Sequence, residues 1–260
     1  YGLGNDGNEF KIITQVFLYK FMNDKFAFEV KKLDSKLKKA ENWEKEISSY
    51  SEDDYEMLLL QLGAETAKLK PQHFISELFG RQNESDFAKL FDDTLMDIAI
   101  TNNDIFSVKT DGGAKVVLFD RLTEYISDGS KRDAFAKAII NKLVGVSFEH
   151  IFNQKFDFYA DIFEYLIKDY NTNSGGKYAE YFTPHAVASI MAAILVNESV
   201  QNVTVYDPAA GSGRLLMNTA HAIGEDKCTI YSQDISQKSS SLLRLNLILN
   251  NLVHSIQNII

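Results

Sequence analysis

The stretch that decides the fold of this 260-residue chain is Val203-Thr-Val-Tyr-Asp-Pro-Ala-Ala-Gly-Ser-Gly-Arg-Leu-Leu216. Its first four residues form a short apolar run that is typical of a buried strand, and its last residues begin a helical pattern. Between them lie Gly211 and Gly213, where the backbone can approach a ligand closely because glycine has no Cβ. A glycine loop at the start of a helix is typical of a ligand-binding site.

The segments around this loop extend the pattern into an α/β domain. The sequence predicts strands at about 203–206 and 228–233, and helices at about 185–197, 212–222 and 236–252. Strands that alternate with helices predict a parallel sheet with right-handed crossovers.

The first two-thirds of the chain read as mostly helical. The sequence predicts one helix from about 8 to 46, with Phe10, Phe17, Phe21 and Phe28 on its buried face. Further helices are predicted at about 84–99, 131–144 and 155–170, an N-cap at Ser51, and loops at 111–113 and 171–176. The basic run 31–39 is interpreted as a solvated helix face, with a contact to nucleic acid or a partner as the alternative.

The composition excludes several classes of protein. A net charge of −9 argues against strong nucleic-acid binding by this chain alone, although a partner could supply a basic surface. Cys228 is the single cysteine, which favours a reducing, cytoplasmic location. The five histidines show no metal-ligand spacing, so we expect no metal site. We expect no membrane span, and the N-terminus has neither a signal-peptide pattern nor a methionine, which suggests a piece of a longer gene product.

Two carboxylates narrow the range of ligands that the glycine loop could bind. Asp207 comes just before the loop, and Asp234 ends the next predicted strand, 21 positions after Gly213. A carboxylate at that strand end suits ribose hydroxyls. A third glycine is replaced by Leu216, and Asp207 would repel a diphosphate, so a cationic nucleoside, S-adenosylmethionine, is favoured over NAD. The alternative is a tight strand–helix turn that binds nothing.

Two longer motifs carry a family resemblance. The segment 175–184, Gly-Gly-Lys-Tyr-Ala-Glu-Tyr-Phe-Thr-Pro, followed by the segment 206–216, resembles the adenine-N6 DNA methyltransferases. The nearest resemblance is to the modification subunit of type I restriction–modification systems, and the segment 161–167 is similar to a helix that this family carries upstream. The resemblance implies a mainly α-helical N-terminal domain at 1–150. It also implies the start of an α/β Rossmann-like S-adenosylmethionine-dependent methyltransferase domain at 151–260, incomplete in this chain.

The resemblance also implies a set of cofactor-binding residues. The Tyr/Phe-Thr-Pro element would lie over the methionine end of S-adenosylmethionine, the glycine loop would cradle the cofactor, and an acidic residue would bind its ribose. In this chain these residues are Tyr181, Phe182, Thr183, Pro184, Asp207, Ala209, Gly211, Gly213 and Asp234. The family usually has Glu at the last position, so the shorter Asp234 is a mild departure.

The catalytic motif of that family is absent from these 260 residues. The family uses an Asn/Asp-Pro-Pro-Tyr/Phe tetrapeptide, whereas the chain has only Pro71, Pro184 and Pro208, none followed by another proline. We therefore expect a truncated form that carries the cofactor half of the site and is inactive alone. The resemblance implies DNA, a specificity subunit and a restriction subunit as partners. A nicotinamide-dependent oxidoreductase, a non-catalytic interaction module, and an RNA or protein methylase remain as alternatives.

Overall fold

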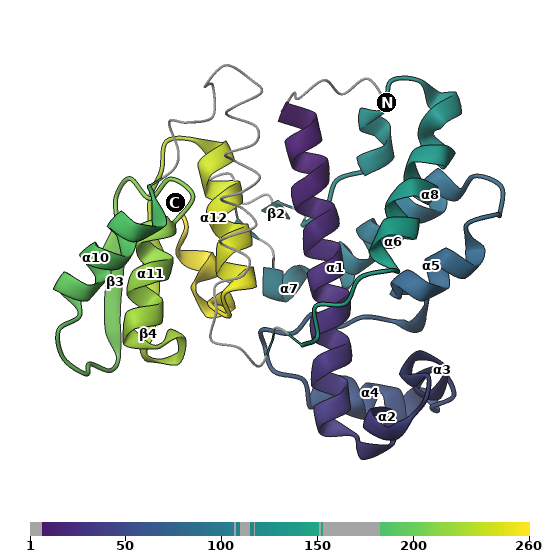
Figure 1. The fold of residues 1–260 in the computed structure, drawn as a ribbon, viewed down its shortest axis with the longest axis horizontal. Coiled ribbons are helices and arrows are strands. Elements are labelled where there is room, and N and C mark those ends of the chain that lie inside the picture. The colour runs from purple at the N-terminus through teal and green to yellow at the C-terminus, as the bar shows by residue number, and fades with distance from the viewer. Residues whose placement is uncertain (1–6, 107, 110–114, 117, 151, 153–182) are drawn as a thin grey trace. The chain divides into compact units, whose positions relative to one another are not determined.

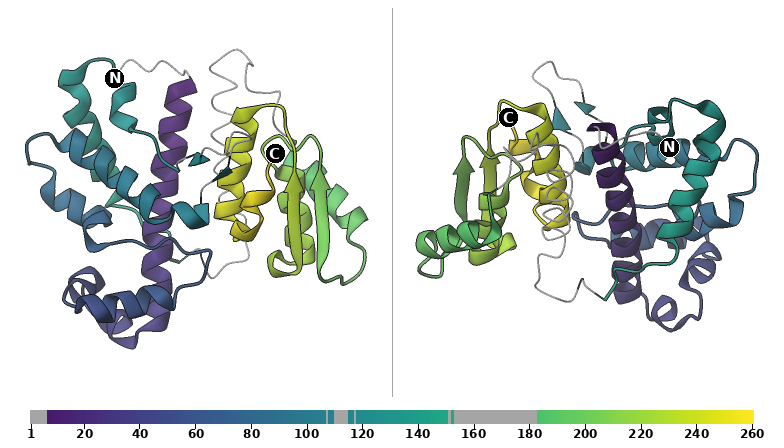
Figure 2. Two further views of the ribbon diagram at one scale, coloured as in Figure 1. Left: turned by 180° about the vertical axis from the view of Figure 1, so that it is seen from behind. Right: turned by 45° about the horizontal axis from the view of Figure 1, so that its top comes forward.

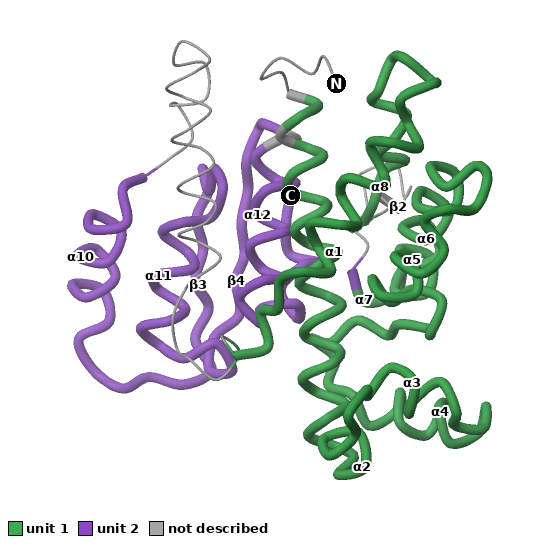
Figure 3. Tube along the Cα trace, turned by 45° about the vertical axis from the view of Figure 1, so that its right-hand side comes forward, with its two compact units in different colours: residues 1–105, 117–155 green, residues 106–116, 156–260 purple. Residues whose placement is uncertain are grey.

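The chain folds into two compact units. The computed structural model describes all residues except 1–6, 107, 110–114, 117, 151 and 153–182 (Figure 1). Unit 1 comprises residues 1–105 and 117–155, and unit 2 comprises residues 106–116 and 156–260 (Figure 3). The described part is mostly helical and has a small parallel sheet in unit 2, as the sequence predicts. The predicted helix at 155–170 and the loops at 111–113 and 171–176 lie outside the described residues, in whole or in large part.

Unit 1 is built from helices of unequal length. Two of the predictions are confirmed here, since α6 and α8 occupy the stretches expected at 84–99 and 131–144. The elements are α1 (Gly7–Leu33), α2 (Ser35–Lys39), α3 (Trp43–Ser48), α4 (Glu52–Leu60), η1 (Pro71–His73), α5 (Ile75–Arg81), α6 (Phe87–Thr101), η2 (Leu122–Tyr125), η3 (Gly129–Lys131) and α8 (Arg132–Leu143). A further short helix, α7 (Asn103–Phe106), spans the boundary between the two units in the sequence.

The prediction of one helix from 8 to 46 is wrong, because three helices occupy that stretch. α1 ends before Asp34, where the backbone becomes extended. The Asp34 side chain caps α2 by accepting the backbone N–H of Lys36. The Asn42 side chain caps α3 in the same way by accepting the backbone N–H of Lys45. Asp and Asn side chains compete with the helix for backbone N–H groups, and this competition interrupts a pattern that periodicity alone would extend. Ser51 caps α4 as predicted.

The predicted phenylalanine stripe of α1 is only partly buried. Phe21 is 3% exposed, whereas Phe17 and Phe28 are half-buried against other aromatic rings of unit 1. The side chain of Phe10 lies outside the described residues. A second aromatic group forms around the single tryptophan, with the ring of Trp43 5.1 Å from that of Phe74. Unit 1 therefore has a core of its own, and Trp43 lies beside it.

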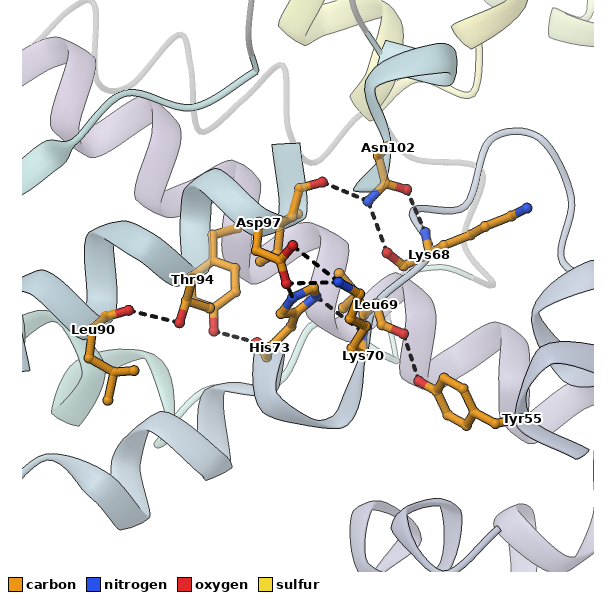
Figure 4. Close-up of polar contacts among 11 residues, drawn as sticks. Tyr55, Lys68, Leu69, Lys70, His73, Leu90, Thr94, Asp97 and Asn102 are labelled. Carbon is orange, nitrogen blue, oxygen red and sulfur yellow. Dashed lines mark hydrogen bonds and ion pairs between the residues drawn. The ribbon is translucent and has the colours of Figure 1, made fainter. Parts of the chain in front are cut away.

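A closed polar network fixes the centre of unit 1 (Figure 4). The imidazole of His73 is fully buried, with Nε2 2.7 Å from a carboxylate oxygen of Asp97. Its Nδ1 accepts the backbone N–H of Lys70, so Nε2 carries the proton in the neutral ring. The ammonium of Lys70 reaches the same carboxylate at 2.9 Å, and the Tyr19 hydroxyl donates to the His73 carbonyl. Burial lowers the pKa of His73, although the hydrogen bond to Asp97 opposes that shift.

Unit 2 contains the α/β pattern (Figure 2). Its elements are β1 (Val108–Lys109), β2 (Lys115–Val116), α10 (His185–Leu195), β3 (Val203–Asp207), α11 (Arg214–Ile223), η5 (Glu225–Lys227), β4 (Cys228–Ser232), α12 (Gln237–Leu249) and η6 (Val253–Asn258). β1 and β2 form an antiparallel pair. β3 and β4 are parallel, as predicted, with Val203 opposite Cys228 and Asp207 opposite Ser232. None of the helices in the described part is both long and apolar enough to cross a bilayer.

The parallel pairing brings the ends of β3 and β4 to one edge of the sheet. Because the two strands run in the same direction and in register, the loops that follow Asp207 and Ser232 leave from neighbouring positions. The backbone N–H of Gln233 donates to the Asp207 carbonyl at 3.0 Å, which extends the pairing beyond the strand ends. The glycine loop and Asp234 therefore lie at the edge where parallel sheets bind ligands.

Candidate functional site

The glycine loop joins β3 to α11 through two left-handed residues. Gly211 has φ +55° and Gly213 has φ +84°, a region that residues with a Cβ rarely adopt. Gly213 is also the residue that precedes the first turn of α11. A Cβ built on Gly213 would lie 2.1 Å from Cδ1 of Leu243 in α12. The positive φ therefore favours glycine at this position, and a side chain there would also displace the end of Leu243.

Most backbone N–H groups of the loop are satisfied within the protein. Ala209 donates to the Asp207 carboxylate, and Ala210 donates to the Gln233 carbonyl. Gly211 donates to the Asp234 carboxylate at 2.8 Å, and Gly213 donates to the Ala210 carbonyl at 2.8 Å. Of the N–H groups at 209–213, that of Ser212 alone has no partner in the described part of the chain. A loop that cradles a diphosphate leaves several N–H groups free for it, whereas in this loop four of the five already bond within the protein.

The two carboxylates hold the loop from both sides. Asp207 uses Oδ1 for the Ala209 N–H, and Oδ2 has no hydrogen bond or ion pair to the described residues. Asp234 uses Oδ2 for the Gly211 N–H and Oδ1 for the Ser236 N–H, which comes just before α12. Each carboxylate oxygen can accept about two hydrogen bonds, so both groups keep acceptor capacity toward the adjoining hollow.

The helix α12 closes the loop from another direction. The side-chain amide of Asn246 donates to the Ser212 carbonyl at 2.6 Å, and Leu243 lies against Gly213. Asn246 is 8% exposed, so this bond lies in the interior of unit 2. The loop is therefore braced by the end of β4 and by α12 together.

A hollow of about 430 Å³ opens beside the loop, and all its lining residues belong to unit 2. This size falls within the range of small-molecule sites. The lining residues come from the start of α10, the loop, the start of α11 and the β4–α12 connection. They are Thr183, Asp207, Ala209, Ala210, Gly211, Ser212, Arg214, Leu215, Asp234, Ile235, Ser236 and Ser239.

The hollow brings together five of the nine residues that the sequence predicts to bind a cofactor: Thr183, Asp207, Ala209, Gly211 and Asp234. Gly213 belongs to the same loop but does not line the hollow, and Pro184 precedes α10 as its N-cap residue. Tyr181 and Phe182 lie outside the described residues.

Sequence reasoning missed several lining residues that follow the acidic position. The side chain of Ile235 is fully exposed, at 104% of its reference area, although isoleucine is usually buried. Ser236 and Ser239 line the hollow beside it. The sequence signal that could have found Ile235 is its position directly after Asp234. An isolated apolar residue there belongs to no pattern of buried core residues.

Metal ligands do not gather in the described part of the chain. No group of three or more His, Cys, Asp and Glu side chains there has the geometry to hold a metal ion.

Comparison with known proteins identifies relatives of the region that contains the hollow. Residues 154–260 match the family model described as N-6 DNA Methylase. The methylase subunit of the type I restriction enzyme MpnII from Mycoplasma pneumoniae is 30% identical over 127 residues, which cover 48% of this chain and 23% of that protein. The HindI methylase subunit from Haemophilus influenzae is 28% identical over 96 residues, which cover 35% of this chain and 21% of that protein.

A solved structure has a similar fold over almost the whole chain. The methyltransferase subunit of a type I restriction–modification system from Streptococcus thermophilus superposes with a TM-score of 0.71 at 21% identity, over 98% of this chain and 54% of that one. The chain spans less than a quarter of the curated relatives it matches. The resemblance carried by the motifs at 175–184 and 206–216 is confirmed.

Proposed function

We propose that this chain carries the cofactor-binding part of a DNA adenine-N6 methyltransferase, the modification subunit of a type I restriction–modification system, with S-adenosylmethionine as the methyl donor. The observation that supports this most directly is the glycine loop, whose N–H groups bond mostly within the protein, flanked by Asp207 and Asp234. The family match over residues 154–260 and the methylase relatives support the reaction class. Unit 2 is, on this proposal, the beginning of a Rossmann-like domain.

The loop suits a cationic nucleoside better than a dinucleotide. A diphosphate needs several outward N–H groups, whereas in the described structure four of the five at 209–213 are engaged internally. The remaining donor, Ser212 N–H, would suit a single carboxylate, such as that of the methionine moiety. Asp207 adds negative charge beside the loop, which favours an ammonium or sulfonium and disfavours phosphate. The nicotinamide-dependent alternative is therefore not supported.

Different residues around the hollow would bind different parts of the ligand. Asp207 would attract the ammonium group, and Thr183 would contact the methionine end together with Tyr181, Phe182 and Pro184. Asp234 would accept hydrogen bonds from the ribose hydroxyls while it keeps the loop in place.

Ile235 would pack on the purine ring, because its exposed side chain lines the hollow next to Asp234. Burial of this side chain on binding supplies a reason for a fully exposed isoleucine at this position.

In the proposed reaction the cofactor donates the methyl group, and the residues of this chain orient the cofactor. S-adenosylmethionine supplies a methyl group on a sulfonium to the exocyclic amine of a target adenine. That amine is a weak nucleophile because its lone pair is delocalised into the ring, so alignment of donor and acceptor matters most. The residues of the hollow hold the donor in one orientation. The Asn/Asp-Pro-Pro-Tyr/Phe element that would accept the rotated base is not among residues 1–260.

The rest of the proposed function concerns domains, partners and location. Residues 1–150 would form a helical N-terminal domain, and residues 151–260 would form the first part of the methyltransferase domain. DNA, a specificity subunit and a restriction subunit are the proposed partners, and a cytoplasmic location is proposed. An acidic chain with a net charge of −9 fits a subunit whose partners supply most of the DNA contact.

The test is a calorimetric titration of the full 260-residue chain with S-adenosylhomocysteine, the product form of the donor, and separately with NADH. We expect heat of binding for S-adenosylhomocysteine and none for NADH. Asp234→Ala should abolish the heat, because it removes both the ribose acceptor and the bond to Gly211. Asp226→Ala is the matched control, since it removes an exposed carboxylate of unit 2 that does not line the hollow.

Two outcomes would contradict the proposal. Tighter binding of NADH would favour an oxidoreductase, and absence of heat with either ligand would favour a non-catalytic interaction module.

A further inference from the structure

The side chain of Asn246 makes an unusual bond across unit 2. Its amide Nδ2 donates to the carbonyl of Ser212, 34 positions earlier, at 2.6 Å. The amide oxygen of Asn246 is buried and has no hydrogen-bond partner in the described part of the chain. A leucine would avoid that cost at this position of a leucine-rich helix, so the donated bond is what Asn246 supplies.

The bond holds the part of the loop whose backbone conformation is least favourable for residues other than glycine. Ser212 lies between Gly211 and Gly213, which both have positive φ. Its carbonyl is held by Asn246, while Leu243 of the same helix fills the space that a Cβ on Gly213 would need. Asp234 holds the Gly211 N–H from the other side. α12 is itself tied to this site, because Asp234 also accepts the Ser236 N–H at its start.

We propose that Asn246 is a positioning residue for cofactor binding, which acts by holding the Ser212 carbonyl so that the glycine loop is preformed before the ligand arrives. The inference rests on the proposed function, since it concerns the same hollow. Binding to a preformed loop avoids the entropy cost of ordering it at the moment of binding. The bond directs the Ser212 carbonyl toward α12, and Ser212 itself lines the hollow.

The test compares Asn246 of α12 with Asn250, the C-cap residue of the same helix, in the full chain. Asn246→Leu removes the bond to the loop and also removes the unpartnered amide oxygen. Asn250→Leu is the control, because Asn250 has similar burial and bonds to the Asn246 carbonyl and to the His221 ring, and no hydrogen bond joins it to the loop. Affinity for S-adenosylhomocysteine is measured by calorimetry, the folded state by thermal melting, and the loop by hydrogen exchange of the Gly211 and Gly213 amides.

We expect Asn246→Leu to weaken S-adenosylhomocysteine binding about tenfold without a matching fall in melting temperature. Exchange of the two glycine amides should quicken in Asn246→Leu and stay slow in the wild type and in Asn250→Leu. A merely structural role would instead lower the melting temperature and leave the affinity of the folded protein unchanged.

Three results would overturn the inference. The first is wild-type affinity in a folded Asn246→Leu protein. The second is equal weakening by Asn250→Leu. The third, which needs no variant, is exchange of the wild-type Gly211 and Gly213 amides at the rate of an unstructured peptide. If the wild type binds no S-adenosylhomocysteine, the proposed function fails, while the exchange comparison still decides whether Asn246 holds the loop.

Discussion

Two polar clusters of this molecule are both built on aspartate carboxylates and have different consequences. In unit 1, His73 has both ring nitrogens bonded within the protein, to Asp97 and to the Lys70 backbone. In unit 2, Asp207 and Asp234 bond to the glycine loop and still face a hollow of about 430 Å³. We call the first cluster closed because both imidazole nitrogens of the buried His73 are occupied, while the Asp97 and Lys70 side chains are partly exposed, and we assign it to the fold. The second is open on one side, and an open cluster with spare acceptors is where a ligand can add bonds.

The strongest test of this comparison is a substitution of Gly213, whose backbone conformation in the open cluster favours glycine. We expect Gly213→Ala to weaken S-adenosylhomocysteine binding at least about 100-fold, because alanine disfavours φ +84° and its Cβ would meet Leu243. Calorimetry measures the affinity, and thermal melting should show a lower stability. Gly80→Ala is the control, since nothing lies within 4 Å of a Cβ there and alanine favours the helix α5. Unchanged affinity in Gly213→Ala would mean that the loop is not the ligand site.

The closed cluster should affect stability and leave binding intact. We expect His73→Ala to lower the free energy of unfolding by about 2–3 kcal/mol, because it removes a fully buried ring and leaves the part-buried Lys70 N–H and part of Asp97 without partners. Urea unfolding followed by Trp43 fluorescence measures this in unit 1, where the only tryptophan lies. His254→Ala, in an exposed position of unit 2, should leave the Trp43 transition unchanged. A folded His73→Ala protein that had lost ligand affinity would show that the two clusters are not independent.

The sequence predicts the open cluster better than the closed one, and the reason is physical. The glycine loop, Asp207 and Asp234 follow from local rules: a strand end, a left-handed turn, and a second strand end one crossover later. The parallel strands β3 and β4 and the order of helices around them follow from the same periodicity. No local rule joins His73 to Asp97, 24 positions away on another helix, and only the packing of unit 1 brings them together.

The same distinction explains the errors within the predictions. The break of the first helix at Asp34 depends on one side chain competing for a backbone N–H, which the phenylalanine spacing conceals. Ile235 and Asn246 were missed because a single exposed isoleucine and a single buried asparagine carry no periodic signal. Their roles become visible only when the hollow and the Ser212 carbonyl are located in space.

A smaller effect would sharpen the assignment of Ile235 to the open cluster. We expect Ile235→Ala to weaken S-adenosylhomocysteine binding about fivefold, because a side chain that is fully exposed in the free protein would be buried against the purine. Its melting temperature should stay that of the wild type, since no burial is lost in the free protein. Ile190→Ala, another exposed isoleucine of unit 2 that does not line the hollow, should change neither quantity. Equal affinities for both variants and the wild type would remove Ile235 from the site.

The smallest effect is a pH dependence that should appear in the closed cluster alone. Because burial lowers the pKa of His73 in the folded state, the unfolded chain takes up a proton near the ordinary value of 6.5 while the folded protein resists it. The unfolded state then binds more protons, so the stability of unit 1 should fall as the pH drops from 7.5 toward 5. The lowered pKa of Asp97 acts in the same direction, but near and below its ordinary value of 3.8, outside this window. Urea unfolding followed by Trp43 fluorescence at several pH values measures the slope, which should be shallower in His73→Ala. An equal slope in both proteins would show that the folded structure accepts the imidazolium at His73.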